Sequence, residues 1–74
     1  MKTNDEILTI LSEYPDEYLI EASHDFRLLI IPETSNLRTL RERCFGEEGN
    51  NHVIQYLNLG VFLAMELGRR LEYH

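Results

Sequence analysis

One long helical segment near the C-terminus constrains the fold of this chain more than any other feature. Asn50 or Asn51 is placed to cap it, and it runs to about Glu72 without a proline. At about 100° per residue, its polar side chains fall in one sector roughly 120° wide. That sector consists of Gln55, Asn58, Glu66, Arg69, Arg70 and Tyr73. Leu59 and Phe62 lie at its edge or inside it, so both are at risk of exposure. The remaining apolar surface is wider than one layer of secondary structure usually covers, which favours a further contact with a second copy or a partner. We expect this helix to be the central element of the domain.

Two glycines interrupt this helix, and each costs about 1 kcal/mol relative to alanine. Gly60, Ala64 and Gly68 follow one another at intervals of four and form a smooth strip opposite the polar sector. Small side chains let another backbone approach closely, and closer packing offsets the lost helix propensity. The sequence therefore predicts a close contact along this strip, either within one chain or between two copies. The apolar residues that flank it are Val53, Leu57, Val61, Leu67 and Leu71.

The N-terminus carries the pattern of a capping box. Thr3 and Glu6 are spaced so that each side chain bonds the backbone N–H of the other, and apolar residues follow on one helical face. The sequence predicts a first helix that ends near Glu13, because Pro15 disfavours helical geometry in the residue before it.

Residues 18–31 allow two interpretations. Two short, partly β-branched apolar runs are separated by Ser23, His24 and Asp25 and closed by Pro32, which is typical of a β-hairpin. Alternatively, Pro15 begins a second helix that runs through Ser23, with acidic side chains at its positive end. We favour the hairpin, because four consecutive apolar residues before a proline suit a strand.

A short third helix follows. Thr34, Ser35 or Asn36 supplies its cap, Leu37, Leu40 and Cys44 line one face, and Gly46 ends it. The predicted fold is thus one α+β domain, residues 1–74, ordered helix, β-hairpin, helix and long C-terminal helix. The alternative is an all-α fold of four helices.

The charge of the chain is unevenly placed. The net charge is −6, and residues 1–37 carry all of it, whereas residues 38–74 are neutral. An acidic half repels phosphate backbones and attracts basic partners. The single cysteine and the lack of an N-terminal signal pattern favour a reducing, cytoplasmic location, and no uncharged run is apolar and long enough for a membrane span.

The sequence offers little chemistry. His24, His52, His74 and Cys44 lack the spacing of metal ligands, so we expect no metal and no cofactor. A nucleophile pair of Cys44 with His52 is the least implausible catalytic site, but Cys44 shares an apolar face and is better explained as a buried hydrophobe. We therefore expect no catalytic residues and no enzyme.

These observations favour a small acidic protein-interaction module. It either self-associates through the strip or docks an acidic face on a basic protein, as an inhibitor of a nucleic-acid-binding protein would. That face consists of Asp16, Glu17, Glu21 and Asp25. The alternative is a helix-turn-helix-like DNA-binding regulator that uses residues 36–58. Nucleic acid is the less favoured partner, because the chain is acidic and holds one lysine.

Overall fold

The computed structural model describes residues 2–28, 31, 34–46 and 52–72 of the chain. Helices make up 85% of these residues, and none of them lies in a β-strand. The four helices are α1 (Asn4–Ser12), α2 (Asp16–Leu28), α3 (Asn36–Phe45) and α4 (His52–Glu72). The prediction of an α+β fold is therefore wrong, and the alternative of four helices is confirmed.

The segment predicted as a hairpin is α2. Pro15 directly precedes this helix, and its carbonyl accepts hydrogen bonds from the N–H groups of Tyr18 and Leu19 at 3.1 and 3.3 Å. Leu19 and Ala22 are fully buried. Phe26, four residues further on, packs against them. These three residues are spaced by three and four, which is the spacing of one face of a helix. The segment is helical because burying this face stabilises the fold by more than the strand preference of its β-branched residues. Residues 29–30, half of the apolar run that suggested a strand, lie outside the described residues.

The other helix ends largely follow the sequence. Thr3 Oγ1 accepts from the Glu6 N–H at 3.2 Å while the Glu6 carboxylate accepts from the Thr3 N–H, so the capping box is confirmed. Ser35 caps α3, and Gly46, with a φ of 71°, ends it. The predicted caps Asn50 and Asn51 lie outside the part of the chain that is described.

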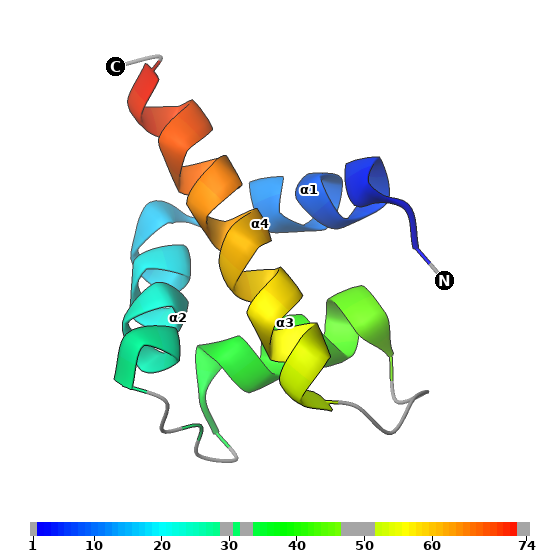
Figure 1. Ribbon diagram of the computed structural model, residues 1–74. Coiled ribbons are helices and arrows are strands. Elements are labelled where there is room, and N and C mark those ends of the chain that lie inside the picture. Colours follow the sequence, from blue (N-terminus) through cyan, green and yellow to red (C-terminus); the bar gives the residue numbers. More distant parts are fainter. Residues whose placement is uncertain (1, 29–30, 32–33, 47–51, 73–74) are drawn as a thin grey trace.

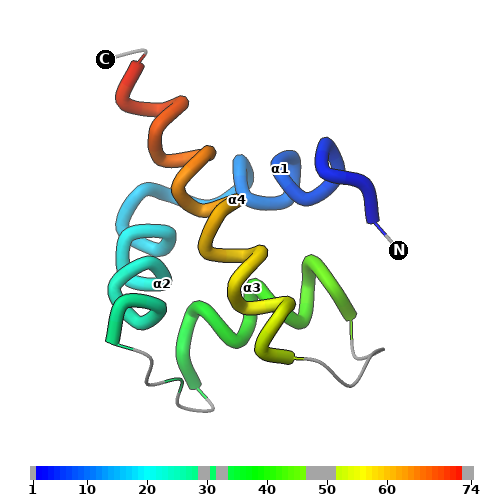
Figure 2. Tube along the Cα trace, in the orientation of Figure 1, coloured from blue at the N-terminus to red at the C-terminus, as the bar shows by residue number. Residues whose placement is uncertain are grey.

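Helix α4 is the central element, as predicted. It contacts each of the other three helices, and the ribbon and the tube show it in front of α3 and the end of α1, with α2 beside it (Figure 1, Figure 2). All four helices contribute to one buried cluster on its inner side. The cluster consists of Ile7, Leu11, Leu19, Ala22, Leu37, Leu40, Cys44, Leu59 and Leu63.

The orientation of α4 differs from the prediction. The polar sector was expected to face solvent, yet Glu66 is only 2% exposed, and Leu59, at the edge of that sector, is fully buried. Phe62 is half-buried and packs against the core. Of the described residues in the predicted polar sector, Glu66 is therefore buried, Gln55 and Arg70 are half-buried, and Asn58 and Arg69 are exposed, while part of the apolar surface faces outward.

Candidate interaction surface

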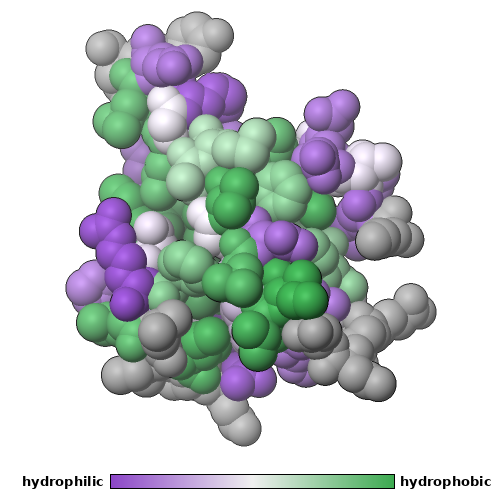
Figure 3. Space-filling view, in the orientation of Figure 1, coloured by the Kyte–Doolittle hydropathy of each residue, from purple (hydrophilic) through white to green (hydrophobic). Residues whose placement is uncertain are grey.

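The side of α4 that points away from the core is apolar. Of the eight large hydrophobic residues that are exposed among those described, six lie on this helix, at exposures of 50% to 74%. Ala64 and Gly68 lie between them and are also exposed. We call this surface the outer face. It consists of Val53, Ile54, Leu57, Val61, Ala64, Met65, Gly68 and Leu71. Hydrophobic side chains gather along the course of α4 in the space-filling view (Figure 3).

The outer face is opposite the buried face of the same helix. At about 100° per residue, its midline lies roughly 150° from the direction of Leu59 and Leu63, which are in the core. A surface groove of about 490 Å³ borders the outer face at Met65 and separates it from Leu8 of α1. Helix α4 thus has two apolar faces, and only one of them is buried by the rest of the described chain.

The structure divides the predicted small-residue strip between these two faces. A β-carbon on Gly60 would lie 2.6 Å from Cζ of Phe26, so this glycine is in close contact with α2. A β-carbon on Gly68 would meet nothing within 4 Å. Of the predicted flanking residues, Leu67 is half-buried against the core, whereas Leu57 and Val61 are exposed. The first glycine is therefore explained within one chain, and the second is not.

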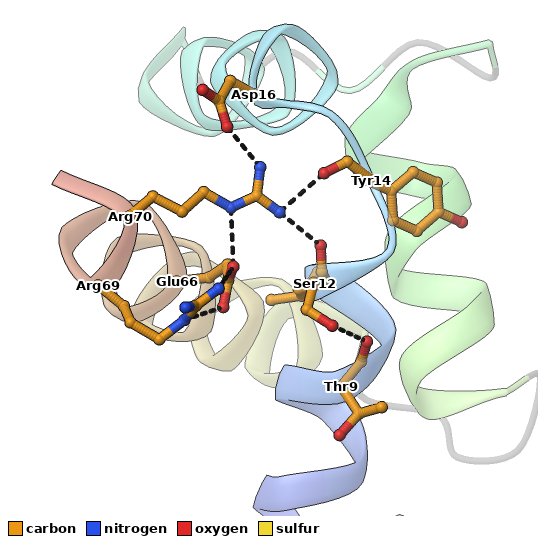
Figure 4. A network of polar contacts seen from close by, with 8 residues as sticks. Thr9, Ser12, Tyr14, Asp16, Glu66, Arg69 and Arg70 are labelled. Atoms are coloured by element: carbon orange, nitrogen blue, oxygen red, sulfur yellow. Dashed lines mark hydrogen bonds and ion pairs between the residues drawn. The ribbon is translucent and has the colours of Figure 1, made fainter. Parts of the chain in front are cut away.

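A polar network fixes the orientation of α4. The buried Glu66 carboxylate accepts from Arg69 Nε at 3.1 Å and Nη2 at 2.6 Å, and from Arg70 Nε at 2.7 Å (Figure 4). The hydrogen bond from Arg69 does most to lower the pKa of Glu66, against the opposing effect of burial. Glu66 is therefore a buried carboxylate that stays charged because two guanidinium groups surround it.

Arg70 extends this network to the corner between α1 and α2. Its Nη1 donates to Asp16 at 2.6 Å, and its Nη2 donates to the carbonyl oxygens of Leu11 at 3.1 Å and Tyr14 at 2.7 Å (Figure 4). These carbonyls belong to the end of α1 and the turn after it, and the Leu11 carbonyl also accepts from the Tyr14 N–H at 3.2 Å. The hydrogen bond to Glu66 raises the pKa of Arg70. We call Glu66, Arg69, Arg70 and Asp16 the inner network.

The sequence indicated only part of the inner network. Glu66 precedes Arg69 by three and Arg70 by four, which is the spacing of helical ion pairs. Such pairs usually lie in solvent, and nothing in the sequence places this one between helices. That is why the sequence did not predict the burial of Glu66.

The predicted acidic face is rearranged. Asp16 is tied to Arg70 in the inner network. Glu17, Glu21 and Asp25 follow one another at intervals of four along α2, on a side of the helix that is exposed or half-buried. We call these three residues the acidic stripe.

The arginines of α3 face their own chain. Arg41 is 3% exposed and donates to Gln55 Oε1 at 2.9 Å. Arg38 donates to the carbonyl of Ile31 at 3.4 Å. Arg43 bonds the Tyr14 hydroxyl at 2.9 Å and pairs with Glu13. This engagement weighs against a helix-turn-helix use of residues 36–58, because phosphate contacts need accessible cations.

The thiol of Cys44 is 1% exposed, and burial raises its pKa to about 11. A thiol in that state is a poor nucleophile at neutral pH. No group of three metal-ligating side chains occurs within residues 2–28, 31, 34–46 and 52–72. In the same part of the chain, no helix combines the length and the apolar character that a membrane crossing requires.

Comparison with known proteins gives no relative for this chain. No protein family, no curated protein and no solved structure matches its sequence or fold. The outer face, the inner network and the acidic stripe are therefore the features from which a function can be inferred.

Proposed function

We propose that this chain is a non-catalytic protein-interaction module that binds through the outer face of α4. One observation supports the proposal. Six large apolar side chains, each at least 50% exposed, lie along one side of α4. Isolated exposed hydrophobes are ordinary, but a contiguous apolar patch on a soluble domain marks a contact surface.

The size of the patch supports the same function. Its exposed apolar area is on the order of 600 Å², the upper end of the largest patch on a typical monomer. A chain of 74 residues buries only about 60% of the surface that its unfolded form exposes, so covering this patch would add to a marginal stability. A buried Cys44 also fits the reducing, cytoplasmic location that we infer for the module.

Site-specific photo-crosslinking tests the proposal. Val61→Cys places one reactive thiol on the outer face, and Glu17→Cys places one on the exposed side of α2 as the matched control. The buried Cys44 does not compete for the label. In the cells that make the chain, a benzophenone attached at position 61 should yield a discrete protein adduct, and one at position 17 should not.

The crosslink requires a second measurement to count as binding. Val61→Asp should weaken association with the crosslinked protein by at least about tenfold, because it buries an unpaired charge. The proposal is contradicted if position 61 gives no adduct, or if the same adducts form with equal yield at both positions.

A second candidate function rests on the acidic stripe. The spacing of Glu17, Glu21 and Asp25 on one side of α2 presents three carboxylates to a basic protein surface, as an inhibitor of a nucleic-acid-binding protein requires. Reversing all three charges should slow association with such a partner and remove the salt dependence of the rate. An unchanged rate would eliminate this candidate and leave the outer face unaffected.

A further inference from the structure

We propose that the occupant of the outer face is the outer face of a second copy of this chain, with the two α4 helices antiparallel. This inference rests on the proposed function, since it requires the outer face to bind protein. It goes further by naming the partner, the direction of the partner's helix and the residues that face each other.

The first support is the spacing of the residues along the midline of the outer face. Six exposed residues follow one another at intervals of three, four, three, four and three. This alternation is the repeat of a coiled-coil seam, in which two helices wind around each other. We call these residues the seam. They are Ile54, Leu57, Val61, Ala64, Gly68 and Leu71.

The seam is not needed for the fold of one chain. Each of its residues is exposed, and a side chain at Gly68 would have open space around it. The seam spans 18 of the 21 residues of α4 and lies on the side away from the core. Packing within one chain therefore does not explain why these positions are apolar.

The second support is the distribution of size along the seam. The first three residues of the seam have large side chains, and the next two, Ala64 and Gly68, are small. In a parallel pair each residue meets its own copy, so Leu57 meets Leu57 and Gly68 leaves a void against Gly68. In an antiparallel pair Leu57 meets Gly68 and Val61 meets Ala64, so a larger residue faces a small one at the four central positions, and the large Ile54 and Leu71 face each other at the ends.

The antiparallel register is also self-complementary along its whole length. The first seam residue meets the last, the second meets the fifth and the third meets the fourth, so all six positions find a partner. A two-fold interface requires this property, because residue i contacts residue j and residue j contacts residue i.

The third support comes from charge. The chain carries −6, so two copies repel unless their acidic surfaces stay apart. The seam holds no charged residue, and the acidic stripe is on α2 rather than on α4. Pairing two outer faces would bury on the order of 1,200 Å², the lower limit of stable, specific interfaces.

The association is tested by light scattering and sedimentation over a hundredfold dilution of the pure protein. The wild type should pass from dimer to monomer on dilution. Leu57→Ala should weaken the dimer by about tenfold or more, since each dimer contains the substitution twice. Leu28→Ala is the matched control, because Leu28 on α2 is as exposed as Leu57 (54% and 53%) and should leave the dimer unchanged.

A size exchange tests the register. Gly68→Leu alone should weaken the dimer by about tenfold or more, because it sets leucine against Leu57. Combining Gly68→Leu with Leu57→Ala should restore the affinity to within about threefold, since the large and small residues merely change places. Both positions are exposed in one chain, so the variants should keep the helical circular dichroism of the wild type.

Disulfide trapping tests the direction of the helices. An equal mixture of Leu57→Cys and Gly68→Cys chains, under a mild oxidant, should crosslink faster than either variant alone. A parallel pair would give the reverse order, with each variant crosslinking to itself.

The outcomes separate the two proposals. A chain that is monomeric at every concentration overturns the antiparallel dimer. If position 61 then still gives an adduct with another protein in cells, the proposed function stands with a different occupant. If neither occurs, both proposals are wrong.

Discussion

At Gly60 the position of a side chain is already occupied by the ring of Phe26. A β-carbon there would lie 2.6 Å from that ring, inside van der Waals contact. Gly60→Ala should therefore lower the free energy of unfolding by about 1–3 kcal/mol, although alanine is the better helix former. Urea denaturation followed by circular dichroism measures this. An increase in stability would mean that α2 and α4 are further apart than described.

Gly68 is the matched control for Gly60, since it lies in the same helix with no neighbouring atom within 4 Å of a β-carbon. Gly68→Ala should raise the free energy of unfolding of the monomer by up to about 1 kcal/mol, because the unfolded chain loses conformational freedom. The comparison is made by urea denaturation in the Leu57→Ala background, which removes the contribution of association. Equal effects at the two glycines would contradict the division of the strip.

Residue-level features of the fold were predictable where the chemistry is local. Thr3, Glu6, Ser35 and Gly46 act within three or four residues of their own position, and all four do what the sequence predicted. Gly60 and Gly68 each follow a leucine in the same helix, but their surroundings in the structure are opposite. Only the packing of Phe26 from α2 separates them.

At the scale of the helices, Arg70 joins α4 to the corner between α1 and α2. Arg70→Met should destabilise the fold by about 3–5 kcal/mol, since it leaves the buried Glu66 carboxylate with Arg69 alone and removes two hydrogen bonds from Arg70 to backbone carbonyls. Arg70→Lys should recover only part of this, because an ammonium lacks the planar fork that reaches Glu66 and both carbonyls. Thermal and urea unfolding of the two variants provide the test, and full recovery by lysine would contradict it.

The charge of Glu66 makes the packing of α4 depend on pH. Its pKa is lowered in the folded chain, so below about pH 4.3, its unfolded value, the unfolded state binds more protons. The stabilisation from Glu66 is therefore present above that pH and is lost as pH falls through the folded pKa. Urea denaturation between pH 6 and pH 3 should show a decline that is shallower in Glu66→Gln. Parallel curves for the two proteins would contradict this role.

The helices themselves were less predictable than their caps. For α2, the spacing of Leu19, Ala22 and Phe26 and the β-branched runs pointed in different directions, and only burial against α3 and α4 decides between them. For α4, the apolar surface is too wide for its sequence to show which part of it is buried. The bonds from Arg70 to α1 and α2 lie on the same side of α4 as the buried Leu59 and Leu63, and they are non-local contacts that no sequence pattern specifies.

At the scale of the whole molecule, one arrangement connects the inner network to the proposed function. Glu66 is buried and Arg70 joins α4 to α1 and α2, so the seam residues lie on the outside, where we propose that they meet an antiparallel copy. The orientation of α4 is therefore decisive for the proposed function: Leu57 and Val61 face outward, and Leu59 and Leu63 face inward.

This orientation is tested by the rates at which single cysteines along α4 react with iodoacetamide. In dilute protein, Leu57→Cys and Val61→Cys should react at nearly the rate of the urea-unfolded chain. Leu59→Cys and Leu63→Cys should react at least about a hundredfold more slowly, as should the buried Cys44. Fast reaction at positions 59 and 63 with protection at 57 and 61 would contradict the orientation of α4, and with it the proposed interaction surface.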